Sequence, residues 1–215
     1  MKISIIITSC NCEKYISRAI RSCIEQSMKK EDYEIIVVDD GSTDHTLHIL
    51  NSFGDWIKPI YLERNFGLPA ACNVGIKRAL SRFIVRVDAD DFIHEDLLKV
   101  AYLYLSMNND FGAVSCDYLL VDEKENVIRR VSSATEPIAC GILFRKDHLI
   151  DIGLYDEEFL LSEDEDLRIR YSDKYSVINI PLPLYRYRMH QTNSTKDSKN
   201  VAFYKEKLKD KHKLN

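Results

Sequence analysis

The chain has 215 residues, of which 45% are hydrophobic and 30% charged, and its formal net charge at pH 7 is −4. These values are typical of a soluble globular protein, and the length suits one domain with a substantial hydrophobic core. The residues after position 195 carry a local charge of +4, so the first 195 carry −8. Because phosphate contacts require a basic surface, this acidic body argues against nucleic acid as a partner.

The first half alternates between apolar strands and amphipathic helices. We expect buried strands at 3–8, 34–38 and 83–87, a short strand at 60–62, and helices at 16–24, 47–53 and 69–81. This order predicts a mostly parallel sheet with helices on both faces. Ligands of such sheets lie at the carboxyl ends of the strands.

Acidic and small polar residues follow the expected strands. Asp39-Asp40-Gly41-Ser42 ends the second strand, and Asp88-Ala89-Asp90-Asp91 ends the fourth. Carboxylates two residues apart at a strand end suit a hard cation such as Mg²⁺ or Mn²⁺. The structural alternative is a turn with a helix cap, in which Ser42 or Thr43 caps one helix and Asp90 or Asp91 begins the next.

The second half has a different pattern. We expect strands at 112–121 and 127–131 around a polar turn, an extended segment at 140–145 and a short helix at 146–152. A further helix begins near Ser162, and 177–189 returns to extended structure. Without an internal repeat or a low-complexity linker, the chain is expected to form one domain over 1–195, with halves 1–110 and 111–195. A basic tail or helix follows at 196–215.

The cysteines and the N-terminus bear on the cellular compartment. The six cysteines include one CxC, at Cys10 and Cys12, but no CxxC pairs of the metal-binding type. Reduced thiols are therefore expected, as in cytoplasmic proteins. The apolar run at 1–7 is too short for a signal peptide or a membrane span, and no later run reaches the required length. We expect a cytoplasmic protein, soluble or held at the inner face of a membrane.

In this order and spacing, the motifs of the chain resemble those of family 2 glycosyltransferases of the GT-A fold. The resemblance runs from residue 3 to about 194. The segments that carry it are Ile5–Asn11, Val37–Asp44, Asn65–Leu68, Asn73–Ile76, Asp88–Asp91, Gly153–Asp156, Glu163–Arg168 and Tyr185–His190. The resemblance implies a Rossmann-like α/β domain, with a nucleotide-binding half at 1–110 and an acceptor half at 111–195.

The resemblance also implies a donor site. The residues implied in nucleotide binding are Thr8, Asn11, Asp39, Asn65, Gly67, Asp88 and Ala89. Thr8 and Asp39 would contact the base, and Asp88 would face the ribose or the metal. Asp90 and His190 would hold Mn²⁺ or Mg²⁺ at the diphosphate. The alternatives are an ordinary turn at 65–67 and a solvated His190 at a strand end.

The catalytic base implied by the resemblance is Asp164, with Glu163 as its rival. Asp91 and Arg188 would lie near the acceptor or support the site, together with Glu163. The structural alternative at this helix is a capping box formed by Ser162 and Glu165. Crowding of carboxylates and the helix dipole would shift the pKa of Asp164 in opposite directions.

The chain departs from the family pattern at two positions. Cys10 stands where the family often has an aromatic residue that stacks on the base. Cys72 stands where the family often has an arginine, which removes a cation from the site. Arg64 and Arg78 are the candidates to replace that cation.

The implied activity is an inverting transfer of a sugar from a nucleotide-diphosphate donor, with a UDP-sugar expected, to an acceptor hydroxyl. The acceptor would be a glycan or a lipid-linked molecule in the synthesis of cell-surface polysaccharide, lipopolysaccharide or glycolipid. Peripheral membrane contact through the basic tail is an alternative to a solvated helix.

Three rival functions are weighed against this activity. A sugar-phosphate nucleotidyltransferase would need a Gly-rich basic loop after the first strand, and a dehydrogenase a GxGxxG motif there. The sequence 5–11 contains neither. A non-catalytic homologue that binds a nucleotide or a partner protein is the remaining alternative.

Overall fold

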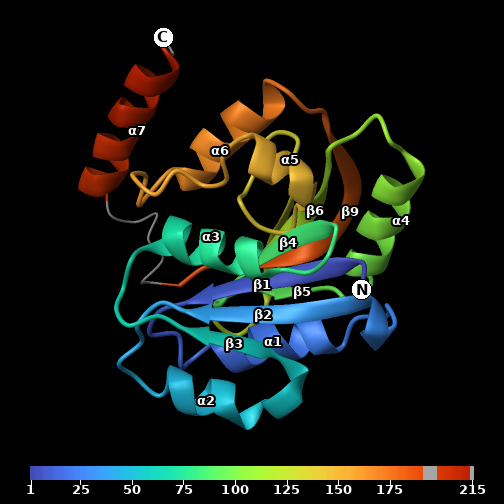
Figure 1. Cartoon of the computed structure of the whole chain (residues 1–215), viewed down its shortest axis with the longest axis vertical. Coiled ribbons are helices and arrows are strands. Elements are labelled where there is room, and N and C mark those ends of the chain that lie inside the picture. Colours follow the sequence, from blue (N-terminus) through green and yellow to red (C-terminus); the bar gives the residue numbers. More distant parts are fainter. Residues whose placement is uncertain (191–197, 214–215) are drawn as a thin grey trace.

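The computed structural model describes residues 1–190 and 198–213. Within these residues, nine strands form one curved sheet with helices on both faces (Figure 1). The strands are β1 Ile3–Ser9, β2 Tyr33–Asp39, β3 Lys58–Tyr61, β4 Phe83–Asp88, β5 Phe92–Ile93, β6 Ala113–Val121, β7 Val127–Val131, β8 Leu143–Arg145 and β9 Val177–Arg188. The α-helices are α1 Ile16–Ile24, α2 Thr46–Ser52, α3 Leu68–Arg78, α4 Leu97–Met107, α5 Lys146–Asp151, α6 Glu163–Ser172 and α7 Ser198–His212. The 3-10 helices are η1 Lys30–Asp32 and η2 Gly54–Trp56.

The parallel part of the sheet has the order β3-β2-β1-β4, as the alternation of elements predicts. Its register places the carboxyl ends of three strands side by side. Thr8 lies opposite Asp88 of β4, and Ser9 lies opposite Asp39 of β2. The polar residues that follow these strands are thereby gathered at one edge of the sheet.

Each face of the parallel strands packs against its own set of helices. Ile5 and Ile7 belong to the apolar cluster that α1 and α4 cover, whereas Ile6 belongs to the cluster under α3. Successive side chains of a strand point to opposite faces, so a continuous apolar run supplies both clusters. β1, β2 and β4 are therefore buried on both sides between two helical layers, whereas β3 at the edge of the sheet is mostly exposed.

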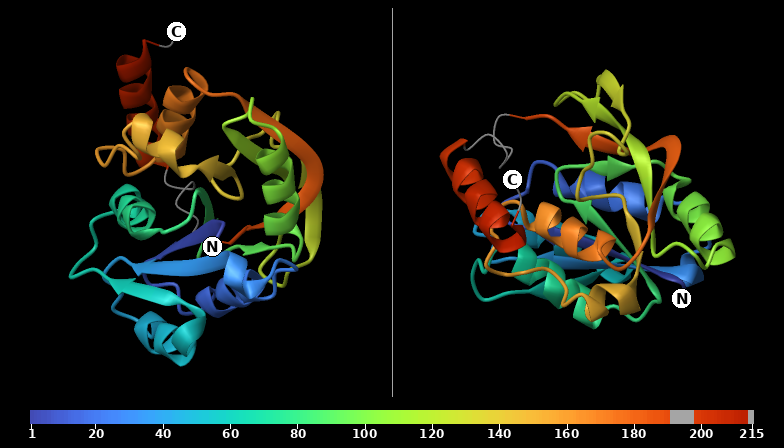
Figure 2. Two further views of the ribbon diagram at one scale, coloured as in Figure 1. Left: turned by 45° about the vertical axis from the view of Figure 1, so that its right-hand side comes forward. Right: turned by 90° about the horizontal axis from the view of Figure 1, so that it is seen from above.

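The second half of the chain extends the same sheet. β8 pairs antiparallel with β4, β6 pairs with β8, and β9 runs parallel to β6 along its length. β9 also pairs with β5, which directly follows the Asp88–Asp91 turn. Figure 2 shows the long β9 curving alongside β6. This return strand carries Arg188 and His190 back to the edge where the parallel strands end.

Helix α7 packs against the loop before α6 and against α6 itself (Figure 1). Leu208 is buried, Lys207 pairs with Glu158, and Lys211 pairs with Asp156. Part of the basic tail is thus engaged within the protein. The expected domain end at 195 and the polar stretch 191–194 lie outside the described residues.

The predicted side-chain helix caps are wrong. α2 begins at Thr46 and α4 at Leu97, both well beyond the expected capping residues, and α6 has no side-chain cap bond. Ser42 is unavailable as a cap because its hydroxyl donates to Asp39 Oδ1 and accepts from the amide of Asn11. The Ser42 hydroxyl is thus occupied by a local bond to Asp39 and a tertiary bond from Asn11, which compete with capping for the same oxygen.

Candidate functional site

A pocket of about 420 Å³ lies at the carboxyl ends of β1 and β4. Of the residues expected at the donor site, its lining includes Thr8, Asn11, Asp88, Ala89, Asp90 and His190. They come from three separate parts of the chain, and the sheet register brings them together. A crevice at the strand ends is the place where open α/β sheets bind ligands.

The carboxylate of Asp88 is held by one side chain from its own strand and by one from the second half of the chain. Its carboxylate accepts hydrogen bonds from Arg86 Nε at 2.8 Å and from Cys140 Sγ at 2.8 Å. Burial and the neighbouring Asp88 charge raise the pKa of the Cys140 thiol, so the thiol stays protonated and donates. The amide of Asp88 donates to the hydroxyl of Tyr185 on β9. The position of Asp88 is therefore fixed on several sides.

Asp90 contacts His190 across the pocket, with 2.7 Å between Oδ2 and Nε2. Burial and the charge of Asp88 raise the pKa of Asp90, which the hydrogen bond from His190 opposes. The His190 ring also lies 5.0 Å from the ring of Tyr15, centre to centre. An imidazole and a carboxylate thus face the pocket as a pair.

Asp91 is buried in the wall of the same pocket and joins the turn to β9. Its carboxylate accepts from the Tyr185 hydroxyl at 2.8 Å and from the Arg188 amide at 2.7 Å. Burial, followed by the charges of Asp90 and Asp88, raises the pKa of Asp91 well above its usual range. Arg188 in turn donates from Nε to the carbonyl of Asp90 at 2.8 Å. Asp91 and Arg188 therefore hold the turn that presents Asp90.

The residues expected to contact the base differ in their surroundings. The Thr8 hydroxyl is buried beside the pocket and finds no nitrogen or oxygen partner among the described residues. Asp39 is buried as well, but its carboxylate accepts from the amide and the hydroxyl of Ser42. Asn11 accepts from the amide of Thr43 through its side-chain oxygen. Asp39 and Asn11 thus shape the loops, whereas Thr8 offers a free hydrogen-bonding group.

The loop at 65–67 is organised by Asp40. Its two carboxylate oxygens accept from the amides of Phe66 and Gly67, at 2.8 and 2.9 Å. Asn65 also accepts from the Gly67 amide and donates to the sulfur of Cys10 at 3.2 Å. This loop, in which Asn65 and Gly67 were expected to lie beside the nucleotide, is held by the strand end that it faces.

Asp164 lines a second hollow of about 460 Å³, with Tyr155, Arg168 and Asn179 among its other lining residues. The preceding residue, Glu163, does not line this hollow and accepts from Arg86 Nη1 at 3.1 Å. Burial raises the pKa of Glu163, and the charge of Arg86 opposes the shift. The two rival carboxylates of α6 therefore have different environments.

Arg86 is the charged residue among several at this site that sequence reasoning missed. It lines the first pocket and pairs with both Asp88 and Glu163. The available signal was an arginine inside the apolar run 83–87. A charge in a buried strand is rare unless it is paired.

The residues at this edge fit a divalent cation. Single ligand atoms of Asp88, Asp91 and Cys140 lie within 4.8 Å of one another, and Asp90 with His190 faces the same pocket. Carboxylate oxygens and an imidazole nitrogen suit Mg²⁺ or Mn²⁺, whereas a protonated thiol does not. Asp88, Asp90 and His190 are therefore the residues that could hold such a cation.

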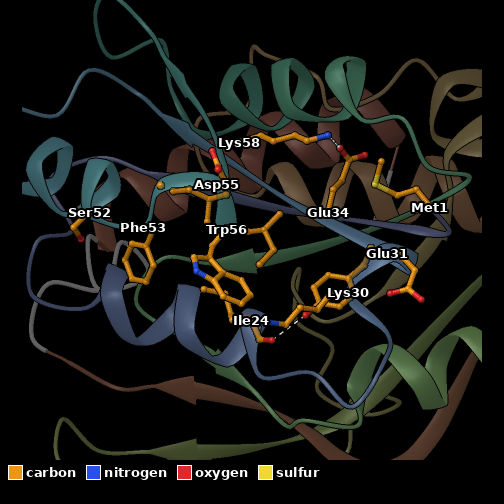
Figure 3. Close-up of a pocket in the computed structure, with 14 residues that line it drawn as sticks. Met1, Ile24, Lys30, Glu31, Glu34, Ser52, Phe53, Asp55, Trp56 and Lys58 are labelled. Atoms are coloured by element: carbon orange, nitrogen blue, oxygen red, sulfur yellow. Dashed lines mark hydrogen bonds and ion pairs between the residues drawn. The ribbon is translucent and has the colours of Figure 1, made fainter.

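A further hollow, of about 810 Å³, lies at the opposite end of the parallel strands (Figure 3). It is bordered by Met1 before β1, by the start of β2 and by Lys58 at the start of β3. The amine of Lys30 lies 3.4 Å from the centre of the Trp56 ring at its side. This hollow is remote from the strand-end carboxylates. It shares no lining residue with the pocket at the carboxyl ends of β1 and β4, which is called the donor-side pocket below.

The model of glycosyl transferase family 2 matches residues 4–160 of the chain. The chain belongs to this family. An uncharacterised glycosyltransferase of Rickettsia prowazekii is 30% identical over 216 residues, which is 92% of this chain and 67% of that protein. The poly(ribitol-phosphate) β-N-acetylglucosaminyltransferase TarS of Staphylococcus aureus is 36% identical over 127 residues. That match covers 58% of this chain but only 21% of TarS, so the chain spans a small part of this relative.

Solved structures of glycosyltransferases share the fold. Residues 1–349 of S. aureus TarS in complex with UDP-GlcNAc superpose with a TM-score of 0.83 at 23% identity, covering 97% of this chain and 65% of that one. A mannosyltransferase of Pyrobaculum calidifontis in complex with GDP-Man and Mn²⁺ gives 0.78 at 16% identity, covering 100% and 64%. The GT-A fold expected from the sequence is confirmed. Among the described residues, no helix has the length and apolar character required to cross a membrane.

Proposed function

We propose that the protein transfers a sugar from a UDP-sugar to an acceptor hydroxyl with inversion at the sugar carbon. The observation that carries this proposal is a pair of hollows that are linked through the small cavity between Arg86 and Tyr155. One presents Asp88, Asp90, His190 and the unpartnered hydroxyl of Thr8, and the other presents Asp164. A transferase needs a donor site and an acceptor site that meet at one reacting bond.

On the donor side, Thr8 supplies a hydrogen-bonding group to the nucleotide, and the loops at residue 11 and 65–67 border it. Asp88, Asp90 and His190 hold Mn²⁺ or Mg²⁺ when the donor is bound. The cation would stabilise the negative charge on the departing diphosphate. The solved relatives with UDP-GlcNAc, and with GDP-Man and Mn²⁺, support this assignment.

On the acceptor side, Asp164 takes the proton from the attacking hydroxyl as a general base. Asp164 lies in the first turn of α6 and lines the hollow of about 460 Å³, which is called the acceptor-side hollow below. Tyr155 contributes an aromatic wall to the same hollow. The hydroxyl oxygen forms the new bond to the sugar carbon while the bond to the diphosphate breaks. This single displacement inverts the configuration of that carbon.

The acceptor is proposed to be a glycan or a lipid-linked molecule of the cell surface. Relatives named as poly(ribitol-phosphate) transferases, including a β-glucosyltransferase of Bacillus spizizenii that is 44% identical over 112 residues, support a cell-surface polymer. That match covers 50% of this chain and 18% of the Bacillus protein. Lys205, Lys209 and Lys213 of the tail are exposed and available to an anionic membrane surface.

The experiment is a thermal-shift panel of UDP, GDP, dTDP and CMP, each with and without Mn²⁺. It compares wild type with Asp90→Ala and with the control Asp96→Ala, since Asp96 also lies beside a histidine, His94, but outside both hollows. A ligand at a hundredfold excess over its Kd stabilises the protein by about 2.7 kcal/mol.

We expect a Mn²⁺-dependent shift with UDP that Asp90→Ala abolishes and Asp96→Ala retains. No shift with any nucleotide would overturn the donor site. Tight nucleotide binding without donor hydrolysis or transfer would favour the non-catalytic homologue instead.

A further inference from the structure

Arg86 carries a buried charge at the centre of the sheet. Its side chain is only 7% exposed, and its neighbours in β4 are apolar. A guanidinium stays charged under all physiological conditions, so burial is tolerated only where anionic partners compensate. Its position in the strand, two residues before Asp88, places both side chains on the same face of the sheet.

The guanidinium of Arg86 reaches Glu163, which lies 77 residues further along the chain. Nε and Nη2 donate to the two oxygens of Asp88, at 2.8 and 3.3 Å, and Nη1 donates to Glu163 at 3.1 Å. Asp88 ends β4, and Glu163 is the first residue of α6. Arg86 thus links the donor-side strand end to the helix that carries Asp164.

Arg86 also stands between the two hollows. It lines the donor-side pocket, while Tyr155, whose ring centre is 5.9 Å from the guanidinium carbon, lines the acceptor-side hollow. Both border a small cavity of about 10 Å³ together with Cys72 of α3. The guanidinium therefore lies where a shift of side chains in one hollow can be transmitted to the other.

The surroundings of Cys72 explain how the expected cation is replaced. Arg64 stacks on the ring of Phe66, and Arg78 is exposed at the end of α3. Neither of these two lines the donor-side pocket. Arg86 brings a guanidinium to this place from the strand, since it borders the same small cavity as Cys72.

We propose that Arg86 is a positioning residue that sets Asp88 and Asp164 relative to each other, in place of a cation on α3. This inference rests on the proposed glycosyl transfer. It predicts that loss of Arg86 impairs donor binding through Asp88 and the chemical step through Glu163 and Asp164. Loss of the Glu163 charge alone impairs only the chemical step.

The test compares Arg86→Met, Arg86→Lys and Glu163→Gln with the control Arg145→Met. Arg145 is also buried, but its guanidinium donates to backbone carbonyls near α4, away from both hollows. The readouts are thermal unfolding, the Kd for UDP with Mn²⁺ by calorimetry, and kcat with a UDP-sugar. A double variant, Arg86→Met with Cys72→Arg, returns the cation to α3.

We expect Arg86→Met to raise the Kd for UDP and to lower kcat, each at least tenfold, and Arg86→Lys to do so less. Glu163→Gln should lower kcat tenfold at an unchanged Kd. Arg145→Met should lower the unfolding temperature but leave the Kd and kcat within twofold of wild type. The double variant should recover at least part of the affinity for UDP.

Two results would overturn the inference alone. The first is an Arg86→Met protein that loses only thermal stability, as Arg145→Met does, while the Kd and kcat stay within twofold. The second is a folded double variant with no recovery of affinity. Failure of the wild type to bind UDP would overturn the proposed function and this inference together, so the two failures are distinguishable.

Discussion

Asp90 and His190 lie a hundred residues apart in the chain, yet Oδ2 and Nε2 are 2.7 Å apart at the mouth of the donor-side pocket. The contact depends on β9, which pairs with β5 directly after the Asp88–Asp91 turn. Arg188 reinforces it by donating to the Asp90 carbonyl. The strand that closes the sheet therefore also completes the candidate cation site.

We expect His190→Ala to weaken Mn²⁺-dependent UDP binding by about 10- to 100-fold, the effect typical of losing a residue around a metal site. Calorimetric titration with UDP in the presence and absence of Mn²⁺ measures this change. His94→Ala is the matched control, because His94 also lies near a carboxylate but outside both hollows. Equal affinities of wild type and His190→Ala would contradict the assignment.

We expect Asp164→Asn to lower kcat by about 10²- to 10⁴-fold, the usual contribution of a general base. The Kd for UDP should stay unchanged, because Asp164 lines the acceptor-side hollow and not the donor-side pocket. Glu165→Gln, the next carboxylate in the same helical turn, serves as the control. Retained turnover in Asp164→Asn would remove it from the catalytic role.

Gly41 should tolerate alanine far less well than Gly54. Both adopt positive φ, so alanine costs about 1–2 kcal/mol at either position. A Cβ at Gly41 would lie 2.5 Å from the carbonyl carbon of Arg64, whereas a Cβ at Gly54 would meet no atom within 4 Å. The backbone clash adds about 1–3 kcal/mol. Urea unfolding of the two variants measures the difference, and equal losses would show that the 64–67 loop yields.

Asp166 should make the protein sensitive to acid. Burial opposes its ionisation, but hydrogen bonds from Arg170, Lys211 and His212 lower the pKa of Asp166 overall. A carboxylate with a lowered folded-state pKa contributes stability above its unfolded pKa of about 3.9, and this is lost as the pH falls through the folded value.

Asp166→Asn should therefore cost about 2 kcal/mol at pH 7, because the buried anion that binds three partly exposed cationic partners is lost, and little at the lowest pH. Urea unfolding as a function of pH measures both effects. The exposed Asp173, at the end of the same helix, provides the control Asp173→Asn. An equal loss at every pH would contradict the electrostatic explanation.

Local sequence patterns determined the parallel strands and the strand-end motifs. Continuous β-branched runs such as 3–8 indicate strands that are buried on both faces, and the alternation with helices leaves a parallel sheet as the consistent solution. The role of Asp88 and Asp90 as candidate ligands could be predicted from their place at the end of β4. These features were predictable because each depends on residues that are close together in the chain.

Only the tertiary structure decided which side chains meet. The contacts of Asp90 with His190 and of Arg86 with Glu163 join distant segments of the chain. The periodicity of the local sequence carries no information about such pairs. Ser42 illustrates the same point, since its hydroxyl, which was expected to cap the next helix, accepts from the amide of Asn11, 31 residues away, and donates to the nearby Asp39. A sequence pattern indicates which side chains can be buried and which can bind a ligand. The partner of a buried charge is set by the register of distant strands, because only the folded sheet brings the two groups within hydrogen-bonding distance.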